Sequence, residues 1–357
     1  MSFDGIMPAS DALHSLAPHL LEVQDIQRRD RSIPSPRPYI IVHVSDPHLS
    51  RMFYREHLKS FKILLRELIA TGFDHLVISG DVVSTGDEED FYLSREILDR
   101  LDLLSGKRLT IVPGNHDIFG GPHRATDLLS FPQHIRGIDY RRHLEMFSTM
   151  YGESFEGAYR LDETSPFPFI KRAGPFLLIG LNSIMPWSVL KNPLGTNGML
   201  DEQQFRGLES LRGSDLLERL IPVAVLHHHF NDVGNENSGR GSFWERIEAN
   251  TMRMKKRRKT IKLLQSLNVR YVLHGHIHRN EIYSRDGITL ANGAGSVCDD
   301  PQRFLKYNKL TFDGEHSAIT TVVLPIEFQT SVASMRYHRQ TRPPVSIPRF
   351  KPGLAAN

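Results

Sequence analysis

The sequence predicts an α/β sandwich, because strand-like and helix-like segments alternate and polar motifs follow the strands. Tyr39–Val44 is mostly apolar and β-branched, and it breaks at Ser45-Asp46-Pro47, which is typical of a strand followed by a loop. Apolar side chains at helical spacing predict a helix over 57–71. The β-α-β-α-β pattern is completed by a strand at His75–Ser79, a helix at Phe91–Leu104 and a strand at Leu109–Val112.

The alternation loosens over residues 118–166, which contain Gly120-Gly121-Pro122 and Pro132. Within this insertion, Tyr140–Met150 has the pattern of a helix. We expect the insertion to form either a lid or wall of a substrate site or a purely structural excursion. The elements predicted after it are strands at Phe176–Leu181, Pro222–Leu226, Val269–His274, Ile288–Leu290 and Ala318–Leu324, and a basic helix at Met252–Leu267.

The composition is that of a globular enzyme. The chain has 357 residues, of which 39% are hydrophobic and 24% charged, so it can bury a sizeable core. Cys298 is the only cysteine, which excludes an intrachain disulfide. No apolar run approaches the roughly 18 residues that span a bilayer. The N-terminal residues include Asp4 and Asp11 and lack an apolar leader, so we expect a cytoplasmic protein.

We divide the chain into three parts. Residues 1–37 lack a strand pattern and form a predicted N-terminal appendage. Residues 38–325 form the predicted catalytic domain, and residues 326–357 form a basic, proline-containing tail. Within the domain, residues 231–241 have the composition of a mobile loop.

Five short motifs rich in Asp and His follow one another along the chain, most of them directly after a predicted strand. They are Asp46-Pro-His48, Gly80-Asp81, Gly114-Asn115-His116-Asp117, His227-His228-His229 and Gly275-His276-Ile277-His278. Each alone has an ordinary explanation, such as a turn-forming Asp or a surface His. Together they supply the oxygen and nitrogen ligands for two adjacent metal ions, and they predict metal-assisted hydrolysis of a phosphate ester.

The residue types fit such a site. Asp46 and His48 offer a carboxylate and an imidazole on one side of a turning chain. Asp81 follows a strand, and a carboxylate can bridge two cations with one oxygen on each. His276 and His278, spaced by two residues, can reach adjacent metals.

The third motif adds a neutral ligand and a proton donor. Asn115 offers a carbonyl oxygen that adds no charge. His116 would stand beside the metals without binding them, free to donate a proton, and Asp117 would orient its ring. We interpret His43 and His274, which lie within predicted strands, as structural.

These motifs resemble those of the calcineurin-like metallophosphoesterases, and the resemblance covers about Tyr39 to Asn292. It implies a two-sheet α/β sandwich with helices outside (an α/β/β/α fold) and a dinuclear site along one edge. It implies that Asp46, His48 and His278 hold the first metal, that Asp81 bridges, and that Asn115, His276 and either His227 or His228 hold the second. We favour His227 because it directly follows the strand.

Departures from other branches of the family narrow the resemblance. Ser84-Thr85 stands where phosphoprotein phosphatases carry Asp-Arg, and Ser84 also replaces the metal-binding Tyr of purple acid phosphatases. Lipid A precursor hydrolases tend to have Arg in place of His116. Asn182-Ser183 and Gly198–Phe205 are similar to the branch of cyclic-nucleotide phosphodiesterases and glycerophosphodiesterases, although Phe230 stands where that branch often has Pro.

The resemblance implies a phosphodiesterase acting on a small phosphodiester such as a cyclic nucleotide. A hydroxide between the metals would attack phosphorus, and His116 would assist the leaving group. The mixed nitrogen and oxygen ligands favour Mn, Fe, Zn or Co. Three alternatives stay open: a nuclease or phospholipid-type phosphohydrolase that docks on nucleic acid or an anionic membrane through Arg253–Lys262, a phosphomonoesterase, and an inactive scaffold of the same fold. The sequence does not predict the oligomeric state.

Overall fold

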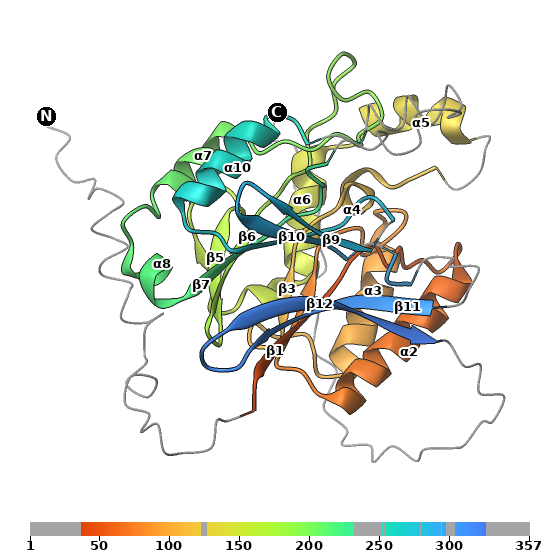
Figure 1. Ribbon diagram of the computed structural model, residues 1–357. Coiled ribbons are helices and arrows are strands. Elements are labelled where there is room, and N and C mark those ends of the chain that lie inside the picture. The colour runs from red at the N-terminus through yellow and green to blue at the C-terminus, as the bar shows by residue number, and fades with distance from the viewer. Residues whose placement is uncertain are drawn as a thin grey trace, which may run out of the picture. The chain divides into compact units, whose positions relative to one another are not determined.

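Two mixed β-sheets flanked by helices make up the fold, which confirms the predicted two-sheet α/β architecture (Figure 1). The computed structural model describes residues 37–122, 127–231, 252, 254–278, 280–293, 295–297 and 304–325. The predicted C-terminal tail, nearly all of the N-terminal appendage and most of the 231–241 loop lie outside these residues.

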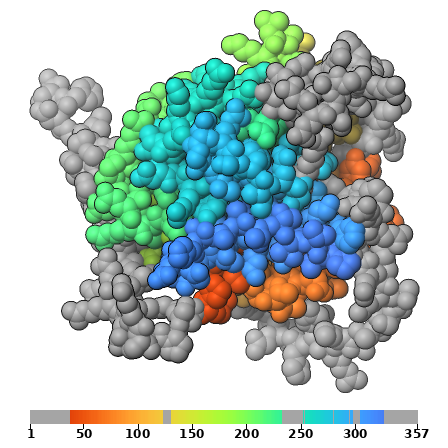
Figure 2. Space-filling view, in the orientation of Figure 1, coloured from red at the N-terminus to blue at the C-terminus, as the bar shows by residue number. Residues whose placement is uncertain are grey.

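The first sheet has five strands in the order β12-β11-β1-β2-β3. Its strands are β1 (Tyr39–Val44), β2 (His75–Ile78), β3 (Leu109–Ile111), β11 (Phe304–Phe312) and β12 (Ser317–Pro325). The pairs β1–β2 and β2–β3 are parallel, whereas β11 pairs antiparallel with β1 and β12. The edge strand β12 lies on the surface, where its blue atoms are in full view (Figure 2).

The second sheet has seven strands in the order β4-β5-β6-β7-β8-β10-β9. Its strands are β4 (Tyr159–Arg160), β5 (Phe169–Ala173), β6 (Phe176–Gly180), β7 (Ile221–Val225), β8 (Tyr271–His274), β9 (Glu281–Arg285) and β10 (Ile288–Asn292). The central strands β6, β7, β8 and β10 are parallel. Parallel strands need crossover connections, and helices supply several of them here.

The helices pack on the outer faces of the two sheets. On the first sheet lie α2 (Arg55–Thr71) and α3 (Glu88–Arg100), and on the second lie α7 (Glu202–Glu209), α8 (Asp215–Arg219) and α10 (Arg257–Ser266). Alternate side chains of one central strand pack into the apolar clusters on its two faces. Phe176 and Leu178 of β6 belong to the apolar cluster shared with the first sheet, while Leu177 and Ile179 belong to the cluster beneath α7, α8 and α10.

The predicted insertion contains further packed elements. They are the end of α4 (Asn115–Phe119), α5 (Asp127–Arg136), α6 (Tyr140–Met150), the 3₁₀ turn η1 (Gly152–Phe155) and β4. Tyr140, which begins α6, donates a hydrogen bond from its hydroxyl to the Ile184 carbonyl at 2.9 Å and accepts one from Asn182 at 2.8 Å. Helix α6 also packs against α4, which carries His116, since the rings of Tyr140 and Phe119 lie 6.1 Å apart between centroids. Among the described residues, no helix has both the length and the apolarity to cross a bilayer.

Candidate metal centre

The His- and Asp-rich motifs converge where parallel strands of the two sheets end. Asp46, Asp81 and Asn115 follow β1, β2 and β3, whereas His227 and His276 follow β7 and β8. The backbone turns sharply at these positions, because four motif residues that are not glycine have a positive φ. They are Asp46 (56°), His48 (45°), Asp81 (51°) and His276 (79°). Such conformations cost free energy and cluster at functional sites.

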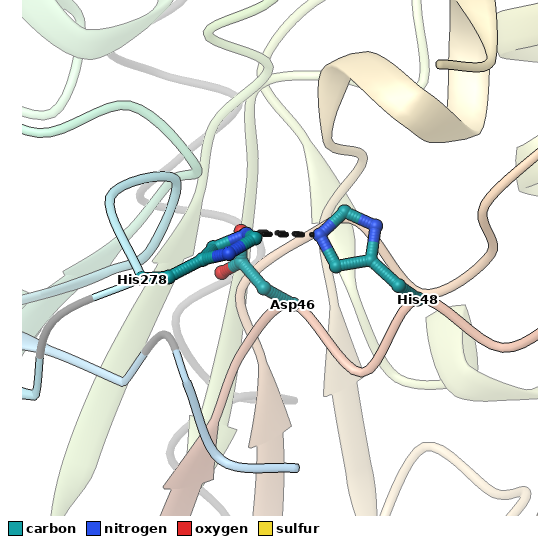
Figure 3. A group of neighbouring side chains, drawn as sticks. All are labelled: Asp46, His48 and His278. Carbon is teal, nitrogen blue, oxygen red and sulfur yellow. Dashed lines mark hydrogen bonds and ion pairs between the residues drawn. The ribbon is translucent and has the colours of Figure 1, made fainter. Parts of the chain in front are cut away.

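Asp46, His48 and His278 form the first group of facing ligand atoms (Figure 3). The Nε2 atoms of His48 and His278 lie 3.1 Å apart. The Asp46 Oδ1 atom lies 3.9 Å from the first of these nitrogens and 3.8 Å from the second. The backbone N–H of His276 donates to both oxygens of Asp46 at 3.1 Å, which fixes the carboxylate in this position.

Asp81, His227 and His276 form the second group, with Asn115 beside them. The His227 Nε2 atom lies 3.1 Å from His276 Nδ1, 3.2 Å from Asn115 Oδ1 and 3.4 Å from Asp81 Oδ2. The other ring nitrogen of His227 lies 2.9 Å from the Ser79 carbonyl, to which it donates. This hydrogen bond leaves the Nε2 atom directed at the group, as second-shell partners of metal-binding histidines do.

Asp81 links the two groups through a single oxygen. Its Oδ1 accepts from the backbone N–H of His116 at 2.8 Å. Its Oδ2 lies 3.7 Å from His48 Nε2 in the first group and 3.4 Å from His227 Nε2 in the second. We expected one Asp81 oxygen to face each metal. The structure differs because the Oδ1 atom of Asp81 accepts a hydrogen bond from the backbone of the helix that begins at Asn115.

Two glycines allow this close approach of loops. A Cβ atom at Gly114 would collide with the backbone nitrogen and carboxylate of Asp81. A Cβ atom at Gly275 would collide with the Ser45 hydroxyl and the Asp46 carboxylate. The glycines in both motifs are therefore required by packing against the ligand-bearing loops.

His116 lies beside the first group rather than within it. Its ring centroid is 4.6 Å from that of His48 in an edge-to-face arrangement. Its Nδ1 atom donates to the Ser84 carbonyl at 3.2 Å, and the ring is partly exposed. His116 can also form a facing group with His48 and Asp81.

The predicted orienting role of Asp117 needs correction. Its Oδ2 accepts from the backbone N–H of Gly114 at 2.8 Å, and its Oδ1 accepts from the backbone N–H of Val83 at 2.9 Å. The Ser84 carbonyl, not Asp117, orients the His116 ring. Asp117 instead ties the loops after β2 and β3 together, because a carboxylate at the third position of a helix can reach back to the first N–H groups. Burial and the nearby charge of Asp81 raise the pKa of Asp117 to about 7.

The His228 ring packs 4.5 Å from the His276 ring between centroids, but its nitrogens face other partners. Its Nδ1 lies 2.9 Å from the Ser183 hydroxyl, and its Nε2 lies 3.2 Å from the Thr196 carbonyl. The Ser183 oxygen also accepts from the backbone N–H groups of His227 and His228 at 3.2 and 3.1 Å. Ser183 therefore anchors the turn that aims the Nε2 atom of His227 at the second group and that of His228 at the Thr196 carbonyl. Its part in this turn was not predicted from the sequence, because a hydroxyl gives no signal apart from its place in the fold.

Opposite charges stabilise each other in the site before any cation binds. Burial opposes ionisation of Asp81, but the neighbouring charges of His227 and His116 outweigh burial and hold its pKa well below the usual value. Burial likewise lowers the pKa of His227, but the charges of Asp81 and Asp46 outweigh it and raise this pKa to about 9. The metal-free protein thus gathers positive charge where carboxylates converge.

The donor atoms fit two metal ions. Two nitrogens that each lie about 2.0–2.1 Å from one metal stand about 2.9–3.4 Å apart at octahedral or tetrahedral angles. The two facing nitrogen pairs, His48–His278 and His227–His276, are both separated by 3.1 Å. Imidazole and carboxylate donors without a thiolate suit first-row transition metals.

Residues 39–280 match the calcineurin-like phosphoesterase family, which is more than half of the chain, so the chain belongs to this family. Its members are metal-dependent phosphoesterases, and they typically bind two divalent metals. No curated protein matches the chain.

Several solved structures are similar to it. A dimetal phosphatase from Danio rerio has 12% identity and a TM-score of 0.48, over 79% of this chain and 98% of the other. A purple acid phosphatase from yellow lupin has 14% identity and a TM-score of 0.46, over 81% and 52%. A phosphopantetheinyl hydrolase from Mycobacterium tuberculosis has 17% identity and a TM-score of 0.39, over 71% and 88%. Likenesses this distant carry no argument about the substrate.

Proposed function

We propose that this protein hydrolyses a small phosphodiester, such as a cyclic nucleotide, with the help of two divalent transition metals. One observation carries the proposal: two groups of facing ligand atoms adjoin each other at Asp81 Oδ2, with the His116 ring beside them. The proposed ligands are Asp46, His48 and His278 for one metal, Asn115, His227 and His276 for the other, and Asp81 for both. Bound metals would polarise the phosphate and lower the pKa of water toward neutrality.

The chain's own residues would then position and protonate the substrate. The Ser84 carbonyl accepts from Nδ1 of His116, so the Nε2 atom of that ring is left for the substrate. In its protonated form, His116 can donate a proton from Nε2 to the departing oxygen. General acid catalysis of this kind typically contributes about 10²–10⁴-fold to the rate.

Sequence features support a diester over a monoester. Ser84-Thr85 stands where phosphoprotein phosphatases carry Asp-Arg, and Asn182-Ser183 and Gly198–Phe205 are similar to the branch of cyclic-nucleotide phosphodiesterases and glycerophosphodiesterases. Two bound metals would supply the largest charges in the site, so the side-chain charges alone do not choose between the esters.

The test compares bis(p-nitrophenyl) phosphate with p-nitrophenyl phosphate, using metal-stripped protein supplied with Mn²⁺. We expect metal-dependent turnover that favours the diester. Asp81→Ala should reduce turnover by at least about 10³-fold, because it removes a ligand shared by both groups. Asp286→Ala is a matched control, since Asp286 is also an aspartate with positive φ (51°) but lies in the β9–β10 turn.

Other outcomes would reject parts of the proposal. Preference for the monoester would assign the protein to the phosphomonoesterases. Turnover that survives in Asp81→Ala would remove the dinuclear site from the mechanism. A folded protein that binds two metals and hydrolyses neither ester would favour the scaffold alternative.

A further inference from the structure

A basic cavity lies on the outer layer of the second sheet, where α7 and α10 pack side by side (Figure 1). Its volume is about 410 Å³. It is lined by Phe205, Glu209, Arg212, Arg258, Lys259, Lys262 and Leu263. The metal centre uses none of these residues, so the function proposed above does not account for the cavity.

Positive charge in the cavity exceeds negative charge. Four cationic side chains line it together with one carboxylate, that of Glu209. The side chains of Arg212, Arg258 and Lys262 make no hydrogen bond or ion pair with any described residue. These three side chains are exposed, and the one carboxylate in the lining, Glu209, offsets only part of the repulsion among the cations.

A carboxylate beside two lysines at the start of α10 is already engaged. Glu202, at the start of α7, accepts from Lys256 at 2.7 Å and from Lys259 at 3.0 Å. These two hydrogen bonds lower the pKa of Glu202 to about 2. The Lys259 ammonium also lies 3.9 Å from the centroid of the Phe205 ring. Lys259 is therefore held over the floor of the cavity, while the other three cations remain available.

Two features of the α10 sequence destabilise a helix. Arg258 and Lys262 are four residues apart, where like charges destabilise a helix. The first turn, Arg257–Lys259, has no acidic residue, although cations are unfavourable there. Sequences depart from such helix preferences at functional sites. A bound anion would offset both the repulsion between Arg258 and Lys262 and the unfavourable charge at the helix N-terminus.

We propose that this cavity binds the phosphate groups of a polyanionic ligand, either a soluble polyphosphorylated molecule or a phosphorylated lipid headgroup. Arg212 and Arg258 offer planar guanidinium donors that suit bidentate phosphate contacts, and Lys262 adds a point charge. A single-stranded nucleic acid fits less well, because the Phe205 ring is only 1% exposed and cannot stack on a base. The cavity thus forms an anion site separate from the metal centre.

The test measures binding of tripolyphosphate to the full-length, metal-stripped protein by isothermal titration calorimetry. We expect binding that weakens as ionic strength rises. The triple variant Arg212→Gln, Arg258→Gln, Lys262→Gln should bind at least about tenfold more weakly, because charge-assisted hydrogen bonds are lost. The control variant Lys62→Gln, Arg66→Gln, Lys107→Gln removes the same charge from the side of the first sheet and should bind like the wild type.

Absence of binding to the wild type, or an equal loss in both triple variants, would overturn the proposal. Thermal unfolding without ligand checks that the variants are folded.

A second measurement identifies the source of the phosphate. Co-sedimentation with phosphatidylglycerol vesicles that is lost only in the first triple variant would indicate a lipid headgroup. Tripolyphosphate binding without vesicle binding would indicate a soluble ligand.

Discussion

At the residue scale, the metal centre depends on strained backbone held by hydrogen bonds between loops. The Asp46 N–H donates to the Gly80 carbonyl at 3.0 Å, and the His48 N–H donates to the Asp81 carbonyl at 3.0 Å. These bonds link the loops after β1 and β2 and hold Asp46 and His48 in the left-handed region. The ligand geometry is thus built into the loops before a metal binds, which lowers the cost of assembling the site.

The two neighbouring histidines after β7 should behave differently when substituted. His227→Gln should lose one of the two metals and most of the activity, because its Nε2 atom faces Asp81, Asn115 and His276. His228→Gln should keep both metals, since His228 faces Ser183 and Thr196. Metal content measured by inductively coupled plasma mass spectrometry, with circular dichroism as the folding control, checks this. Loss of a metal in His228→Gln alone would reverse the assignment.

At the element scale, much of the site framework could be predicted. The strands that end in motifs are apolar, and their motifs start where the apolar run stops, so the approximate positions of β1, β2, β7 and β8 follow from the pattern. The contacts of Asp117 could not be predicted, because they depend on how the loop after β3 packs on Val83. The choice between His227 and His228 likewise depends on a turn anchored by Ser183.

Two strands that contain charged residues, β5 and β11, were not predicted from the sequence. β5 (Phe169–Ala173) contains Lys171 and Arg172, which hide its apolar pattern. β11 pairs with β12, the next strand in the sequence, but also with β1, which is distant in the sequence, and this second pairing cannot be read from periodicity. Lys171 is only 2% exposed and joins the sheets. Its ammonium donates to the Leu109 carbonyl of β3 at 2.5 Å and to the Ser154 carbonyl of η1 at 2.7 Å.

Lys171 should make stability depend on pH. Burial lowers its pKa from 10.5 to about 7, so between these values the unfolded chain holds a proton that the folded chain has released. Raising the pH through this window should therefore favour folding by at most about 1.4 kcal/mol per pH unit. Below about pH 7 both states are protonated, and this contribution to the slope disappears.

Urea unfolding of the wild type and Lys171→Met between pH 7 and 10 measures the effect. The difference in unfolding free energy should shift in favour of the wild type as pH rises, because methionine cannot titrate. Lys191→Met, at an exposed lysine, should show the pH dependence of the wild type. Parallel pH profiles for the wild type and Lys171→Met would mean that the buried ammonium keeps an ordinary pKa.

At the scale of the whole sandwich, each proposed metal would take ligands from both sheets. The first group combines Asp46 and His48 after β1 with His278 after β8. The second combines Asp81 after β2 with His227 after β7 and His276 after β8. β1 and β2 belong to the five-stranded sheet, whereas β7 and β8 belong to the seven-stranded sheet. Bound metals would therefore cross-link the two layers in addition to serving catalysis.

Metal removal should consequently lower the stability of the fold as well as abolish activity. A ligand that binds only the folded state stabilises it by about 2.7 kcal/mol at a concentration 100 times its Kd. For a domain of this size, Mn²⁺ at that excess should raise the Tm of metal-stripped protein by about 4–5 °C.

Calorimetric scans with and without Mn²⁺ measure the shift in the wild type, Asp81→Ala and Asp286→Ala. Asp81→Ala should lose most of the shift because it removes the ligand shared by both groups, whereas Asp286→Ala should keep it. An unchanged Tm at saturating Mn²⁺ in the wild type would show that the metals do not hold the sheets together. An equal rise in all three proteins would place the stabilising ion elsewhere. A shift confined to proteins that keep Asp81 would show that the residues proposed for chemistry also join the two halves of the sandwich.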